Sequence, residues 1–220
     1  MTPAELPCAI ARRLLRWGEG GRTGAHITRY SMYRQLGALM QGVPKQGRVL
    51  SISESGKLCE ALGLASLETD EANFPEHDML HLRFPDESYD FVVSDQVLEH
   101  VLGDPFLAVR ESFRVLKPGG YVVHTTCLIN PIHKYPYDLW RFTPDGLALL
   151  CQDHGEVIET GGWGNRWVWF VVAVGLRFRP VPHSTRSPLH RIAMKNDPLW
   201  PVSTWVVAKK RERGRANSER

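Results

Sequence analysis

The stretch "YDFVVSDQVLEHVLGDPFLAVRESFRVLKPGGYVVHTT" (89–126) decides the fold class, because it reads as a strand, a helix and a second strand. "YDFVVS" (89–94) alternates little and is rich in β-branched and aromatic residues, which is typical of a strand buried on both faces. An Asp-Pro pair supplies the N-cap and first turn of a helix over 104–116. "KPGG" ends that helix, and "YVVHTT" (121–126) predicts the next strand.

The same alternation begins earlier in the chain. A short apolar strand at 48–52 precedes a helix at 57–63, and a weaker strand is predicted at 64–68. Strands that alternate with helices pair in parallel through right-handed crossovers. We therefore expect an α/β fold, with a Rossmann-like, doubly wound, mostly parallel sheet and helices on both faces. Ligands of such sheets bind at the carboxyl ends of the strands, so candidate site residues are sought there.

The charge of the chain is concentrated at its end. The formal net charge of the 220 residues is +3, and residues 209–220 contain six Lys or Arg and two Asp or Glu. The rest of the chain is close to neutral, so the charge does not indicate a nucleic-acid-binding surface. We interpret 209–220 as a solvated, disordered tail. An RNA-modifying enzyme is an alternative that rests on this tail alone.

Cysteine usage and hydropathy favour a cytoplasmic protein. The four cysteines (Cys8, Cys59, Cys127 and Cys151) form no CxxC pair, which argues against a zinc site or a disulfide framework. No signal peptide is expected at the N-terminus. "WVWFVVAVGL" (167–176) is too short to span a bilayer and is read as a buried strand or helix. The alternative is a lipid-facing lobe that makes peripheral membrane contact.

Several short elements follow one another between Asp78 and Gly120. They are "LRFPD" (82–86), Tyr89-Asp90, "LEH" (98–100) and "RVLKPGG" (114–120). In these elements the chain resembles the class I S-adenosylmethionine-dependent methyltransferases, specifically the small type 11-like group with an "LPFPDxSFD…LEHV…RVLKPGG" run. A further stretch, "PIHKYPYDLWRFTPDGLALL" (131–150), is similar to a subset associated with glycans or other secondary products. The resemblance implies S-adenosylmethionine as the cofactor.

The resemblance also implies residues that hold the cofactor. Asp78 would accept a hydrogen bond from the adenine amine, with Met79 beside the ring; the alternative is a solvated loop aspartate. The acid that closes the second strand would bind the ribose, and Glu68 is preferred to Asp70 for this role, with a plain surface glutamate as the alternative. The residues expected beside the methionine half are Ser94, Asp95 and Gln96.

The loop after the first strand departs from the family pattern of one acid and three glycines. Ser51 stands at the position of the acid, Ser53 and Ser55 stand at two glycine positions, and Gly56 remains. Serine leaves room for the cofactor, but a positive φ costs a serine on the order of 1 kcal/mol. We expect Glu54 to supply the missing negative charge for the cofactor's ammonium group. The alternative is a non-catalytic binding or scaffold protein with a degenerate cofactor loop.

The acceptor side is expected after the strand at 121–126. His133 is the predicted general base, because the unperturbed pKa of histidine lies near working pH. Tyr137 and His100 are the other catalytic candidates; the alternatives are that Tyr137 braces the following helix with its neighbours, and that His100 supports the architecture. No His/Asp cluster has the spacing of metal ligands, so no metal is expected.

Together these features predict methyl transfer from S-adenosylmethionine to a small-molecule or glycan acceptor at oxygen. The expected organisation is a helical N-terminal extension or lid (1–45) and one methyltransferase domain (46–208). The acceptor-side insert and loops of that domain are expected at 128–201, before the tail.

Overall fold

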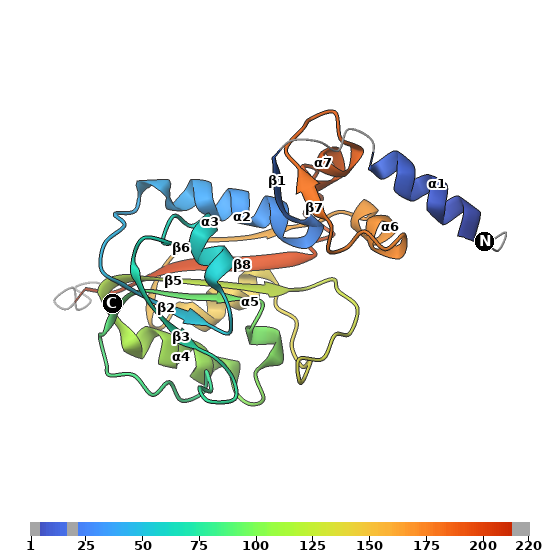
Figure 1. The fold of residues 1–220 in the computed structure, drawn as a ribbon. Coiled ribbons are helices and arrows are strands. Elements are labelled where there is room, and N and C mark those ends of the chain that lie inside the picture. Colours follow the sequence, from blue (N-terminus) through green and yellow to red (C-terminus); the bar gives the residue numbers. More distant parts are fainter. Residues whose placement is uncertain (1–4, 17–21, 213–220) are drawn as a thin grey trace.

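A six-stranded sheet forms the centre of the protein in the computed structural model, which describes residues 5–16 and 22–212 (Figure 1). In pairing order its strands are β3 (Glu68–Ala72), β2 (Arg48–Ile52), β4 (Tyr89–Asp95), β5 (Leu116–Cys127), β8 (Ser203–Lys210) and β6 (Gly155–Trp163). The first four pair in parallel, and β8 runs antiparallel between β5 and β6. The predicted α/β class is therefore confirmed. Most of the predicted tail (213–220) lies outside the described residues.

Helices cover both faces of this sheet. On one face lie α2 (Ile27–Leu39), continued by η1 (Met40–Gly42), and α3 (Gly56–Ala61); on the other lie α4 (Pro105–Val115) and α5 (Pro144–Cys151). The buried side chains form two hydrophobic clusters, one against each face. The predicted cap of α4 is present, since Asp104 accepts from Phe106 N at 2.9 Å, and Thr143 caps α5 by accepting from Gly146 N at 3.1 Å.

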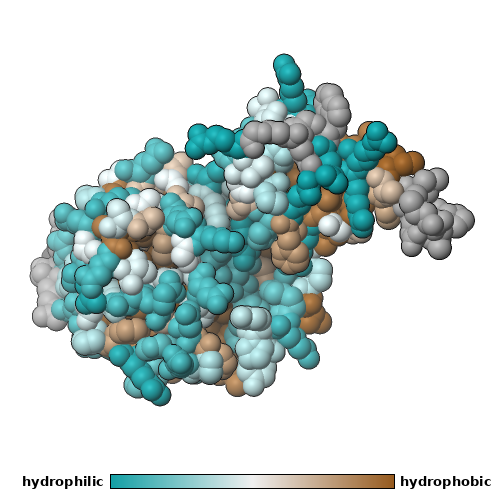
Figure 2. Space-filling view, in the orientation of Figure 1, coloured by the Kyte–Doolittle hydropathy of each residue, from teal (hydrophilic) through white to brown (hydrophobic). Residues whose placement is uncertain are grey.

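A smaller lobe lies beyond one end of the sheet (Figure 1). It contains α1 (Glu5–Leu15), the paired strands β1 (Thr23–His26) and β7 (Pro180–Pro182), α6 (Trp167–Ala173) and α7 (Pro188–Ala193). The apolar segment at 167–176 thus forms the short helix α6, which buries Val168 and Val171 but leaves Trp167 and Phe170 exposed. Figure 2 shows hydrophobic atoms on this lobe beside α1. No helix among the described residues is long and apolar enough to cross a membrane.

Two predicted boundaries are wrong. The second strand was expected at 64–68, but β3 begins at Glu68 and ends at Ala72. Four of the five residues of "ETDEA" are polar, and only Ala72 is buried. The segment therefore lacks the alternation of apolar and polar residues by which a strand is predicted. "KPGG" was expected to lie between helix and strand, yet β5 already begins at Leu116 and includes it.

Arg114 explains why the separate motif elements occur together. Its guanidinium donates to the carbonyls of Leu82 (2.7 Å) and Phe84 (2.9 Å) and to the carboxylate of Asp86 (2.7 Å). It also donates to both oxygens of Glu111, at 2.8 and 2.9 Å, and Glu111 accepts from Leu82 N at 3.1 Å. The "LRFPD" segment is therefore held against α4 by hydrogen bonds from "RVLKPGG".

The Arg114 contact predicts a pH dependence of stability. Hydrogen bonds from Arg114 hold the pKa of Glu111 below its ordinary value of 4.5. A depressed pKa in the folded state contributes stability above the unfolded pKa, and this contribution is lost as pH falls through the folded value. We expect the stability difference between wild type and Glu111→Gln to shrink below about pH 4.5 in urea unfolding. A difference that stays constant down to pH 3 would contradict this account.

Candidate functional site

The loops that follow β2, β3 and β4 are joined by hydrogen bonds at the carboxyl edge of the sheet. Ser53 N donates to Ala72 O at 3.0 Å, and Glu54 N donates to the side chain of Asn73 at 3.0 Å. The Ser55 hydroxyl donates to Ile52 O and accepts from Asp95 N at 2.7 Å. The loop that replaces the glycine motif is thus fixed in place by the neighbouring strands.

This loop keeps the backbone conformation that glycine favours. Ser53 and Glu54 have φ values of 53° and 59°, in the left-handed region. Ser55, by contrast, has φ −79°, so the second serine at a glycine position adopts an ordinary conformation. Two consecutive left-handed residues without glycine store backbone strain, which is typical of functional sites.

The strain predicts opposite effects for two serine substitutions. Ser53→Gly should raise the free energy of unfolding by roughly 0.5–1 kcal/mol, because glycine adopts positive φ without steric cost. Ser55→Gly should lower it by about 1–2 kcal/mol, because the buried hydroxyl makes two hydrogen bonds. Chemical unfolding of both variants checks this. A Ser53→Gly variant as destabilised as Ser55→Gly would show that residue 53 is not strained.

Asp95, at the end of β4, connects this edge to α2. Its carboxylate accepts from Arg29 Nε at 3.0 Å, from the Tyr33 hydroxyl and from Thr125 Oγ1 at 2.7 Å. Burial alone would lower the pKa of Arg29, but Asp95, Tyr33 and Glu99 together more than offset that effect, so the pKa is raised. Burial, reinforced by Asp95, also raises the pKa of Tyr33. Arg29 therefore stays charged and Tyr33 stays protonated at neutral pH.

The structure gives two signs that a ligand fits at this edge. A Cβ atom added at Gly56 would meet nothing within 4 Å, so space is open beside the loop. The side-chain nitrogen of Gln96 is buried and has no hydrogen-bond partner among the described residues, and Gln96 itself has φ 61°. Glu54 is exposed beside this space. The residues present therefore fit a polar ligand that the loop approaches closely.

The other residues expected to hold the cofactor lie in different surroundings. Glu68 opens β3 and pairs with Arg48 at 3.3 Å, so the expectation that it closes this strand is wrong. Ser51 and Ser94 are fully buried within the sheet, and the Ser94 hydroxyl bonds to His124 at 2.7 Å. The Ser94 hydroxyl therefore has its partner inside the sheet.

Asp78 and Met79 lie in the segment after β3. The Asp78 carboxylate accepts from Leu80 N at 2.9 Å and is exposed, whereas Met79 is buried. One side of this short segment thus faces the core and the other presents a carboxylate to solvent. The role of Asp78 toward adenine stays a prediction.

A second group of residues meets at the carboxyl end of β5. Glu99, from η2 (Leu98–His100), is fully buried, and its Oε2 accepts from Thr126 at 2.8 Å. His133 Nε2 lies 4.0 Å from Glu99 Oε1, and the rings of His133 and His100 are 5.0 Å apart. Burial raises the pKa of Glu99 and lowers that of His133. The predicted base thus faces a buried carboxylate.

The neighbours of His133 brace the loop. Asp138 forms a two-pronged ion pair with Arg141, with distances of 2.5 and 2.8 Å, and accepts from His133 N at 2.8 Å. The His100 ring donates to the carbonyl of Tyr137. These contacts are consistent with a structural role for the neighbours of Tyr137 and for His100. The Tyr137 side chain is 41% exposed.

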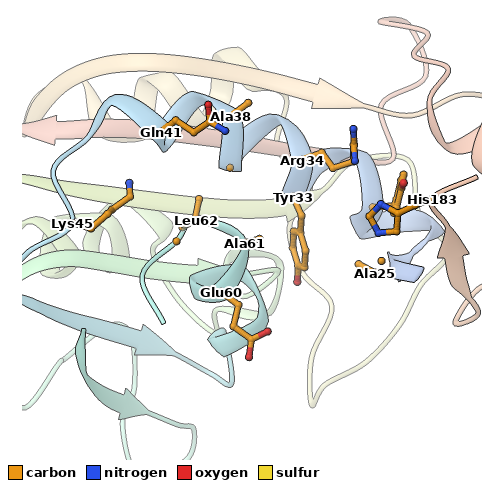
Figure 3. Close-up of a pocket in the computed structure, with 14 residues that line it drawn as sticks. Ala25, Tyr33, Arg34, Ala38, Gln41, Lys45, Glu60, Ala61, Leu62 and His183 are labelled. Carbon is orange, nitrogen blue, oxygen red and sulfur yellow. The ribbon is translucent and has the colours of Figure 1, made fainter. Parts of the chain in front are cut away.

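A separate cavity lies along another part of the fold. It has a volume of about 660 Å³ and lies along α2 beside the end of α3 (Figure 3). None of the predicted site residues lines it, but Tyr33 extends into it from α2. Since the Tyr33 hydroxyl bonds to Asp95, this residue links the cavity to the carboxyl edge.

Sequence reasoning missed Arg29, Tyr33, Asn73 and Glu99. Only Glu99 carried a signal, as the acid of the "LEH" element. The other three follow no motif, because their roles depend on which elements pack against β2 and β4.

Comparison with known proteins agrees with the fold and the motifs. Residues 36–124 match a family model described as a methyltransferase domain. An uncharacterized methyltransferase of Schizosaccharomyces pombe is 37% identical over 97 residues, which are 39% of this chain and 34% of that protein. A demethylmenaquinone methyltransferase of Staphylococcus epidermidis is 31% identical over 105 residues, 47% of this chain and 43% of that protein. The chain thus matches less than half the length of these relatives.

A solved S-adenosylmethionine-dependent methyltransferase of Thermotoga maritima has the same fold. It superposes with a TM-score of 0.51 at 15% identity and covers 94% of this chain and 99% of that one. The matched range includes β2, the loop that follows it, β4 and the "LRFPD" to "RVLKPGG" elements. Residues 36–124 of the chain are therefore similar to a methyltransferase domain, and the chain has the fold of an S-adenosylmethionine-dependent methyltransferase.

Proposed function

We propose that this protein transfers a methyl group from S-adenosylmethionine to a hydroxyl oxygen of a small-molecule or glycan acceptor. The observation that carries the proposal is the loop at Ser53–Gly56, which keeps a glycine-like backbone and leaves open space at Gly56. Backbone strain in this loop lowers the stability of the protein, and it is explained if the strained loop makes room for a bound ligand. The cofactor supplies an electrophilic methyl group on a sulfonium sulfur.

The residues at the carboxyl edge would hold the cofactor. Glu54 would face the ammonium group, and Asp78 would accept from the adenine amine. Asn73, which follows β3 and already binds the loop, replaces Glu68 as the candidate for the ribose hydroxyls. Gln96 offers its unpaired amide N–H groups to the same ligand.

The acceptor would lie against the loop that follows β5. The exposed rings of Tyr135, Tyr137 and Trp140 suit a ring-bearing acceptor, because such rings stack and also form hydrogen bonds. The likeness to demethylmenaquinone methyltransferases supports a small ring-bearing acceptor. The protein's own contribution would be alignment of the acceptor and exclusion of water.

Titration calorimetry with S-adenosylmethionine tests the cofactor part of the proposal. Wild type should bind, and Glu54→Gln should bind on the order of tenfold more weakly, because an ionic hydrogen bond is lost. Glu60→Gln, on the exposed side of α3, is the matched control and should bind as wild type does. Absence of binding at millimolar cofactor would favour the alternative, a non-catalytic scaffold with a degenerate loop.

Transfer of a labelled methyl group to a panel of hydroquinones, phenols and glycans tests the acceptor part. Oxygen methylation of at least one class is expected. Transfer only to nitrogen or carbon nucleophiles would contradict the assignment to oxygen.

A further inference from the structure

Three potential metal ligands converge at the carboxyl end of β5. Glu99 comes from η2, Cys127 is the last residue of β5, and His133 lies in the following loop. One ligand atom from each residue lies within 4.8 Å of those from the other two. In a tetrahedral zinc site with bonds of about 2.0–2.3 Å the ligand atoms lie roughly 3.3–3.8 Å apart, so the three side chains would move slightly closer on binding a metal.

Glu99 has an unusual environment for a carboxylate. It is fully buried, and only Oε2 has a hydrogen bond, from Thr126 at 2.8 Å. Oε1 is buried and has no nitrogen or oxygen donor at hydrogen-bond distance among the described residues. His133 Nε2 lies 4.0 Å from Oε1, and Cys127 Sγ lies within 4.8 Å of a Glu99 carboxylate oxygen. A buried carboxylate oxygen that faces a sulfur and an imidazole nitrogen is suited to a cation.

His133 is oriented as metal-bound histidines usually are. Its Nδ1 lies 3.4 Å from Asp138 Oδ2 and 2.9 Å from the side chain of Asn130, while Nε2 points toward Glu99. Asp138 is itself fixed by the ion pair with Arg141. A carboxylate beside the second ring nitrogen fixes the ring and strengthens the imidazole as a ligand.

We propose that Glu99, Cys127 and His133 form a zinc site with one open coordination position. A carboxylate and a thiolate would neutralise Zn²⁺, so the buried site would carry no net charge. The thiolate favours zinc over calcium or magnesium, which prefer oxygen ligands. The side chain of His133 is 30% exposed, which provides an entry path. His133 would then be a ligand and not a free general base.

The open position gives the site a chemical use. A zinc ion lowers the pKa of a bound hydroxyl and holds its oxygen in place. This use rests on the proposed methyl transfer to oxygen, whereas binding of the metal does not.

Cobalt substitution of the full-length protein tests the site. After removal of metal with a chelator, titration with Co²⁺ should give a thiolate-to-cobalt absorption band that saturates at about one ion per chain. Cys127→Ser should abolish this band. Cys151→Ser is the matched control, since Cys151 is equally buried but lies on α5, and it should keep the band. His133→Gln should keep the band and weaken binding tenfold or more.

Two results would overturn the inference: no thiolate band in wild type, or a Cys127→Ser protein that binds Co²⁺ as wild type does. The thiol would then be a simple hydrogen-bond donor to Glu99. Circular dichroism shows whether each variant folds. If Cys127→Ser does not fold, the weaker cobalt binding expected of His133→Gln tests the site instead. Because the assay contains no S-adenosylmethionine, a protein that binds cobalt but not the cofactor would refute only the proposed function. A protein that binds only the cofactor would refute only the zinc site.

Discussion

Asp95→Asn is expected to lower the free energy of unfolding by about 3 kcal/mol, because it leaves the partly buried Arg29 without its carboxylate. The side chains of Arg29 and Asp95 are only 18% and 12% exposed, so water cannot replace the lost partner. The change also weakens the hydrogen bonds from Tyr33 and Thr125. Urea unfolding monitored by tryptophan fluorescence measures the effect.

Asp86→Asn is the matched control for this prediction. Asp86 also accepts from an arginine, Arg114, at 2.7 Å, but its side chain is 73% exposed. An exposed pair of this kind contributes about 0–1 kcal/mol. Equal losses in the two variants would show that Asp95 does not anchor α2 to the sheet.

Gly56→Val is expected to weaken binding of S-adenosylmethionine on the order of 5- to 150-fold, equivalent to about 1–3 kcal/mol of overpacking. The valine side chain would fill the space that is open beside Gly56 and that the cofactor is proposed to occupy. The protein without cofactor should be as stable as wild type or slightly more stable, because valine favours a helix more than glycine does. Calorimetric titration and thermal unfolding give the two readouts.

Gly42→Val serves as the control. A Cβ at Gly42 also meets nothing within 4 Å, but Gly42 ends η1 and does not belong to the loop after β2. It should bind the cofactor as wild type does. Unchanged binding by Gly56→Val would place the cofactor away from this loop.

Local signals predicted the framework of the fold well. The strand expected at 48–52 is β2, and the strand expected at 89–94 extends by one residue, to Asp95. The helix opened by Asp104-Pro105 has its predicted cap. These elements depend on apolar runs and caps within a few residues, so the sequence alone contains the information that defines them.

The candidate site was less accessible to prediction. The position of Glu68 was misjudged because a polar edge strand has no hydrophobic period. Left-handed backbone was expected at Ser53, but Glu54 shares it and Ser55 does not. The hydrogen bonds that Ser53 N and Glu54 N donate to Ala72 and Asn73 depend on the register between β2 and β3, which a sequence pattern does not contain.

By itself, the sequence determined the α/β class, the order of the elements and the likeness to methyltransferases, because these follow from short-range patterns and contiguous motifs. Only the tertiary structure decided that Arg29 meets Asp95, and that Glu99, Cys127 and His133 share one buried space. The physical reason is that such contacts join side chains far apart in the chain. Their geometry follows from strand order and helix packing, and the spacing of the residues in the sequence does not record it.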